Sequence, residues 1–136
     1  MSDITVTAAQ IAPVFPQKAE IYDLLAAAAI TAGQIVYTTT AGKADLADAS
    51  AAGTIVNLGV ALNAAAAGEA VSVLKRGHVA GFAITSLNGA AKLYVSNTSG
   101  AAADAAGDNS AVIGTVTAIP TVGGVSKLLF VDVSWV

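Results

Sequence analysis

Residues 29–73 read AITAGQIVYTTTAGKADLADASAAGTIVNLGVALNAAAAGEAVSV and hold a complete small β unit. Residues 34–38 carry the β-branched and aromatic side chains that suit a half-buried strand, and Gly42 marks the turn that follows. After a loop, residues 55–62 read as a mostly apolar strand, which a turn at Gly68 reverses into another strand. The stretch therefore predicts a strand, a turn and loop, and then a β-hairpin. It offers packing and turns rather than a reaction centre.

A similar pattern returns in the second half of the chain. Tyr94, Gly100 and Gly114 follow Tyr37, Gly42 and Gly59 by 57, 58 and 55 positions (94 − 37, 100 − 42 and 114 − 59). Two interpretations stay open at this point. The pattern indicates either an internal duplication of one supersecondary unit or a chance similarity among alanine- and glycine-rich strands.

The composition fits one domain of 136 residues with few charges. The charged fraction is 11%, and the mean hydropathy of +0.71 comes largely from alanine. The longest uninterrupted apolar run, residues 24–30, is far shorter than the roughly 20 residues of a membrane-spanning helix. No segment has the pattern of a signal peptide, so we expect no secretion through a membrane. So little charge predicts that oligomerisation or docking onto a larger assembly covers much of the surface.

Charge and cysteine content narrow the function classes further. The formal net charge is −3 and the sequence pI is about 4.7, so the chain lacks the basic surface that nucleic-acid binding requires. The sequence has no cysteine, which excludes disulfides, thiolate metal sites and cysteine nucleophiles.

The candidate chemical residues do not form a recognisable set. His78 is the only histidine and has no nucleophile motif nearby, so we interpret it as a strand residue at a surface or interface. Asp45 and Asp48, with Asp104 and Asp108 in the second half, match no calcium-loop spacing and are interpreted as solvated loop acids. We therefore predict no enzyme activity, no metal site and no cofactor.

Two regions divide the chain. Residues 1–17 predict an extended N-terminal arm rather than a strand inside a sheet, because Pro13 and Pro16 remove backbone donors and favour extended geometry. Residues 18–136 are expected to form a single β domain. Its first segment, residues 18–29, fits a helix by apolar spacing and a strand at 19–25, and we favour the strand.

Short strands and turn signals fill the second half of the domain. Strands are predicted at residues 74–84, 92–97, 111–119 and 125–136, with a turn at Asn88-Gly89 and a loop at 98–110. In the last strand Val131, Val133 and Trp135 share one face, which we expect to close the core or a subunit interface. This pattern predicts an all-β fold, either an antiparallel β-sandwich or a small β-barrel.

Several short phrases together resemble a known family. They are AITAGQIVY (29–37), GKADLADA (42–49), LGVAL (58–62), AGEAVSVL (67–74) and LYVS (93–96). This series of phrases resembles the small alanine- and glycine-rich capsid decoration, or cement, proteins of tailed bacteriophages, over residues 19–133. The resemblance implies a structural virion protein on the outside of the head, commonly trimeric, that binds the major capsid protein and stabilises the shell. It also implies a strand before residue 30, which is why we favour the strand at 19–25.

Two rival classes remain beside this resemblance. One is a small hydrolase, for which the sequence supplies no recognisable nucleophile, base and oxyanion site; the other has a similar framework. A trimeric head-fibre or receptor- or carbohydrate-binding module would use the same strands. The predicted partner-binding residues are apolar and lie at the two ends of the chain: Ile11, Val14, Phe15 and Trp135. We expect the arm to be loosely held in the free protein and to dock onto the capsid or a neighbouring subunit. The alternative is that the arm folds back onto its own domain as an edge segment.

Overall fold

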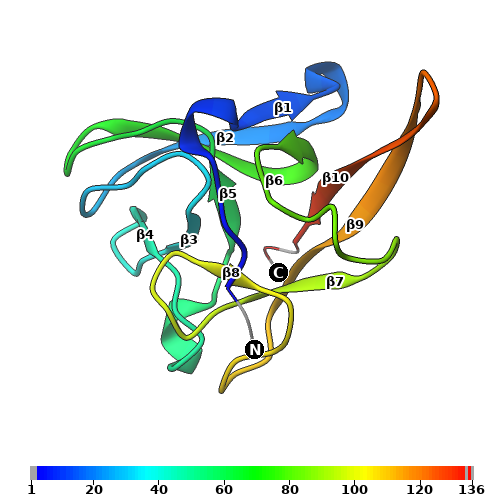
Figure 1. The fold of residues 1–136 in the computed structure, drawn as a ribbon. Helices are drawn as coiled ribbons and strands as arrows, with labels where there is room; N and C mark the ends of the chain where they lie inside the picture. Colours follow the sequence, from blue (N-terminus) through cyan, green and yellow to red (C-terminus); the bar gives the residue numbers. More distant parts are fainter. Residues whose placement is uncertain (1–2, 134, 136) are drawn as a thin grey trace.

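The computed structural model describes residues 3–133 and 135, and it is an all-β fold (Figure 1). Within these described residues, ten strands follow one another: β1 (Ala12–Val14), β2 (Glu20–Leu25), β3 (Ile35–Thr38), β4 (Ala44–Leu46), β5 (Gly59–Ala61), β6 (Ala70–Ala80), β7 (Lys92–Val95), β8 (Ala102–Ala103), β9 (Val112–Thr121) and β10 (Gly124–Asp132). The same part of the chain has three single-turn 3-10 helices: η1 (Ala8–Gln10) before β1, η2 (Pro16–Lys18) and η3 (Ala52–Thr54). No helix among the described residues is long and apolar enough to cross a membrane. The sheet curls into a half-barrel, which confirms the predicted fold class.

The long strand β6 organises the sheet. All strand pairs are antiparallel, and the main path runs β4-β3-β5-β6-β10-β9-β7-β8. One edge of β6 pairs with β5 through its first half and with β10 through its second half. Its other edge pairs with β2 and then with β1. The strand predicted at 19–25 is thereby confirmed as β2, and the helix alternative is wrong.

The two halves of the sheet repeat each other. In the first half, β3 lies between the short strand β4 and the later strand β5. In the second half, β7 lies in the same way between the short strand β8 and the later strand β9. The register repeats as well, because Gly59 pairs with Val36 and Gly114 with Leu93. The strand order is therefore symmetric about the β6–β10 pair, as expected for a duplicated unit.

Backbone hydrogen bonds join the two ends of the sheet path. The amide of Ile35 donates to the carbonyl of Gly100 at 2.9 Å, and the amide of Gly100 donates to the carbonyl of Ala47 at 2.8 Å. The amide of Ala49 donates to the carbonyl of Ser96 at 3.0 Å. These bonds satisfy edge groups that would otherwise remain available for pairing with another chain.

Aliphatic side chains fill the space inside the curl. The main core cluster draws on most strands and contains fully buried Ile35, Leu74, Leu93, Ile113 and Leu129. A smaller cluster of mainly alanine and valine lies beneath β2 and the start of β6. The predicted burial of Val131 and Val133 is confirmed, at 0% and 8% exposure.

The N-terminal arm differs from its prediction. Ala12–Val14 forms β1 and pairs with β6, so the expectation that no strand of the arm lies in a sheet is wrong. The arm is also hydrogen bonded to the domain upstream of β1, where the Thr7 amide donates to the Gly81 carbonyl at 3.0 Å. The prediction of a loosely held arm is therefore wrong, and the edge-segment alternative holds. The physical reason is that proline is excluded from central strands but tolerated at a sheet edge, which is where Pro13 lies.

Smaller differences concern strand lengths. Only Gly59–Ala61 of the predicted strand 55–62 is a strand, because η3 precedes it and Asn57 adopts a positive φ of 46°. The predicted loop 98–110 contains the two-residue strand β8. The strand predicted at 74–84 is the second part of β6, which begins at Ala70 and ends at Ala80, so residues 81–84 lie outside it. The predicted strands at 92–97 and 111–119 are confirmed as β7 and β9, although β7 ends two residues early, at Val95.

Candidate functional site

The structure separates the four predicted partner-binding residues. Ile11 is 9% exposed and belongs to the main core cluster, so its side chain is used within its own chain. Val14 is half-buried at the end of β1, opposite His78 in the register. Phe15 follows it and is 43% exposed. Trp135 lies at the other end of the chain and packs against different residues, Leu58 and Tyr22.

Trp135 packs across strands of its own chain. Its indole Nε1 donates a hydrogen bond to the carbonyl of Leu58 at 2.7 Å, and its ring lies 4.9 Å from the ring of Tyr22. The Lys75 ammonium lies 5.8 Å from the indole centroid. The indole is half-buried and is packed against both core clusters. Trp135 therefore links the end of the chain to β2 and to the segment before β5.

Phe15 contributes to a surface pocket of about 240 Å³, which we call the aromatic pocket. It is lined by residues of the η2 region, β2, β6 and β10: Phe15, Lys18, Glu20, Arg76, Gly77, His78 and Phe130. The His78 ring lies between two phenyl rings, 5.5 Å from Phe15 in an edge arrangement and 4.8 Å from Phe130 at 45°. Three rings from distant parts of the sequence therefore converge on one site, because β1 and β10 both pair with β6 at His78.

Charged groups surround these rings. The Arg76 guanidinium lies 5.9 Å from the Phe130 ring, within cation–π range. Its ion pair with Asp132 is long, at 3.9 Å, and both side chains are more than half exposed. Glu20 instead pairs with Lys75 at 3.5 Å. An exposed pair such as Arg76–Asp132 contributes little stability, so the Arg76 guanidinium can exchange partners readily.

Phe15 has an unusual backbone. Its φ and ψ are both 60°, in the left-handed region, which is costly for a residue with a large side chain. The conformation connects β1 to η2 and directs the ring toward His78. Strained backbone of this kind is concentrated at ligand sites and clamps, and it persists where the surrounding structure fixes it.

A second pocket, of about 220 Å³, lies between the arm and two turns. Ile4, Val6 and Ala8 line it from the arm, and residues 31–34 and 99–101 line it from the turns. Its one long polar side chain, Gln34, is occupied by the hydrogen bond that its Oε1 accepts from the Thr31 amide at 2.9 Å. The lining supplies no ionisable group for chemistry.

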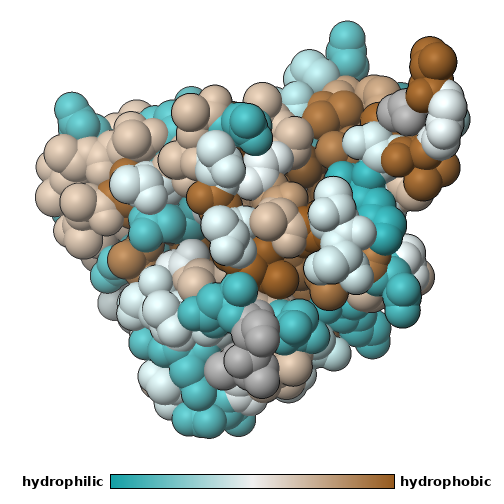
Figure 2. Space-filling model, viewed as in Figure 1, coloured by the Kyte–Doolittle hydropathy of each residue, from teal (hydrophilic) through white to brown (hydrophobic). Residues whose placement is uncertain are grey.

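Exposed apolar side chains gather on two other elements. The edge strand β2 leaves Ile21, Tyr22 and Leu25 exposed at 39%, 44% and 50%. The β9–β10 hairpin projects from the body, and its tip exposes Val122 at 108% and Val125 at 66% (Figure 1). Figure 2 shows apolar surface at the end of this projection. Neither group was predicted from the sequence, although a valine beside Gly123 in a hairpin turn was a usable signal.

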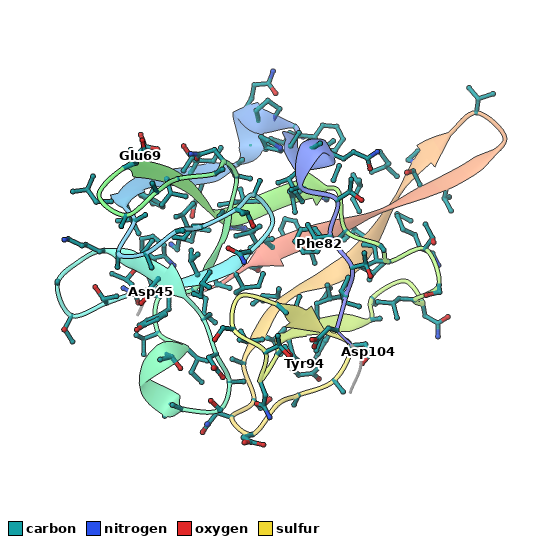
Figure 3. All side chains as sticks on the ribbon, turned by 60° about the vertical axis from the view of Figure 1, so that its left-hand side comes forward. Asp45, Glu69, Phe82, Tyr94 and Asp104 are labelled. Carbon is teal, nitrogen blue, oxygen red and sulfur yellow. The ribbon has the colours of Figure 1, made fainter. Side chains whose placement is uncertain are left out.

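The loop acids lie apart. Figure 3 shows Asp45 and Asp104 on separate parts of the molecule, so these two acids do not share a site. Hydrogen bonds from Ser50, through its side chain and amide, and from the Ser99 hydroxyl hold the pKa of Asp48 below its usual value. No group of three or more acidic or histidine side chains that could hold a metal ion occurs within residues 3–133 and 135.

The comparisons add no relative. Neither the protein-family models, nor the curated proteins, nor the solved structures contain a match to this chain.

Proposed function

We propose that the chain is a structural virion protein that binds the outer surface of a phage head, as trimers, and stabilises the capsid shell. The observation that carries this proposal is the exposed apolar surface on β2 and on the β9–β10 hairpin. Five sequence phrases resemble capsid decoration proteins, and this resemblance implies the major capsid protein as the partner.

The two apolar elements have the properties of contact surfaces. An edge strand with exposed large side chains is prone to pair with other chains unless a partner covers it. A projecting hairpin with a valine at its tip can place that side chain in a pocket of a partner, where burial contributes about 1.5 to 3 kcal/mol. On a shell, a symmetric oligomer repeats each such contact, so modest contacts sum to firm attachment through avidity.

Substitution of the hairpin tip tests this proposal. Val122→Asp should weaken binding to purified heads at least tenfold in a co-sedimentation titration, because it places a charge in an apolar contact. The matched control is Val56→Asp, which changes another exposed valine, 49% exposed in the segment after η3. Thermal unfolding of both free variants should match the parent. Equal retention of the two variants on heads would show that the hairpin does not contact the shell. Failure of the parent chain to bind any head would overturn the proposal.

A further inference from the structure

We infer that the aromatic pocket binds a hydroxylated ring carrying one carboxylate, of the kind that uronic acid residues supply in acidic polysaccharides. This binding function is additional to shell attachment and does not depend on it. The pocket is small and combines aromatic rings, two cationic side chains (Lys18 and Arg76) and one carboxylate of the protein (Glu20).

The size and the rings define the shape of the ligand. A volume of about 240 Å³ is below the roughly 300–1,000 Å³ of typical small-molecule pockets, so it accommodates about one ring. Phe15 and Phe130 present aromatic surface, and the half-buried His78 ring lies between them. Aromatic side chains combine an apolar face with little conformational entropy loss, which suits them to pack against the C–H face of a sugar.

The charges define the polar groups of the ligand. Lys18 and Arg76 line the pocket, and the long, exposed pair of Arg76 with Asp132 leaves its guanidinium able to engage a carboxylate through two N–H groups. Glu20 lines the same pocket and can accept hydrogen bonds from hydroxyl groups. The Glu20 carboxylate repels a doubly charged phosphate more strongly than a singly charged carboxylate, so the arrangement favours a singly charged sugar acid.

The backbone of Phe15 holds one ring in place before any ligand arrives. Its left-handed conformation is fixed between β1 and the first turn of η2, where Pro16 restricts the chain. A ring positioned in advance loses less freedom on binding, which raises affinity for a small ligand. The strained backbone of Phe15 therefore contributes to the shape of the pocket that its side chain lines.

An NMR titration of the full chain with a glucuronic acid disaccharide tests the inference. Amide signals of residues 76–78 and of Phe130 should shift in a saturable manner. Arg76→Gln should weaken binding at least tenfold by removing the carboxylate partner. Phe15→Gly should do the same by removing a ring, and it should preserve the fold because glycine adopts a positive φ without strain. The control is Lys43→Gln, which makes the same charge change at an exposed turn outside the pocket.

Four results would overturn the inference, the fourth of which concerns the two pocket variants. The first is the absence of saturable shifts at these residues. The second is equal binding of a neutral glucose disaccharide, and the third is equal binding of inorganic phosphate, since either would show that the carboxylated sugar is not what the site selects. Unchanged affinity of both pocket variants would place any observed binding elsewhere on the chain.

Discussion

Deletion of residues 2–17 is expected to lower the free energy of unfolding by about 3 kcal/mol or more, because the deletion removes a core side chain together with an edge strand. Ile11 is 9% exposed and packs in the main cluster, and single deletions of buried isoleucine side chains already cost about 2 to 5 kcal/mol. The arm also supplies β1 and the hydrogen bond that the Thr7 amide donates to the Gly81 carbonyl. Urea unfolding followed by tryptophan fluorescence measures the change.

If the truncated chain does not fold, two point variants test the same contribution of the arm to stability. Ile11→Ala should cost about 2 kcal/mol or more, since it leaves a cavity in the core. Val14→Ala, at a half-buried position on the same arm, should cost clearly less. If the free energies of unfolding of the truncated chain and the parent differ by less than about 0.5 kcal/mol, the arm is loosely held and does not pack on the domain.

Gly114→Ala is expected to destabilise the fold by about 3 kcal/mol or more, because there is no room for a Cβ atom at this position. A Cβ there would lie 2.1 Å from the carbonyl oxygen of Phe130. That oxygen belongs to the backbone of β10, which is held in register with β9, so it cannot move aside as a side chain can. Chemical denaturation of the variant gives the magnitude.

Two other glycines provide the scale for this result. Gly59 occupies the equivalent place in the first half. Its Cβ would lie 2.3 Å from the Cγ1 atom of Val73 and 3.0 Å from the carbonyl oxygen of Leu74, so the backbone contact is looser than at Gly114 and Gly59→Ala should cost less. Gly53 has no atom within 4 Å of an added Cβ, and Gly53→Ala should change stability by less than about 0.5 kcal/mol. Equal effects at positions 114 and 53 would show that the close approach of β9 and β10 is wrong.

The strands could be predicted because their signals are local. Alternation and β-branched composition located β3, β7, β9 and β10, and the spacing of Tyr37/Tyr94 and Gly59/Gly114 indicated a repeat. The matching register supports duplication over chance similarity, because the same pair of positions lies opposite each other in both halves.

The aromatic pocket could not be predicted, since its members are distant in sequence. Phe15, His78 and Phe130 meet only because β1 and β10 pair with β6 at one residue, and no local pattern specifies that register. The arm was misjudged for a related reason. The two prolines correctly excluded a central strand, but they carry no information about an edge position.

Cryo-electron microscopy of purified heads incubated with the full chain tests whether the protein coats the shell. We expect added density on the outer shell surface, arranged as trimers at repeated lattice positions, into which this half-barrel fits. We also expect that the β2 edge and the β9–β10 hairpin face the shell or a neighbouring copy. Heads that remain bare at saturating protein concentration, or density into which the fold does not fit, would contradict the proposed function.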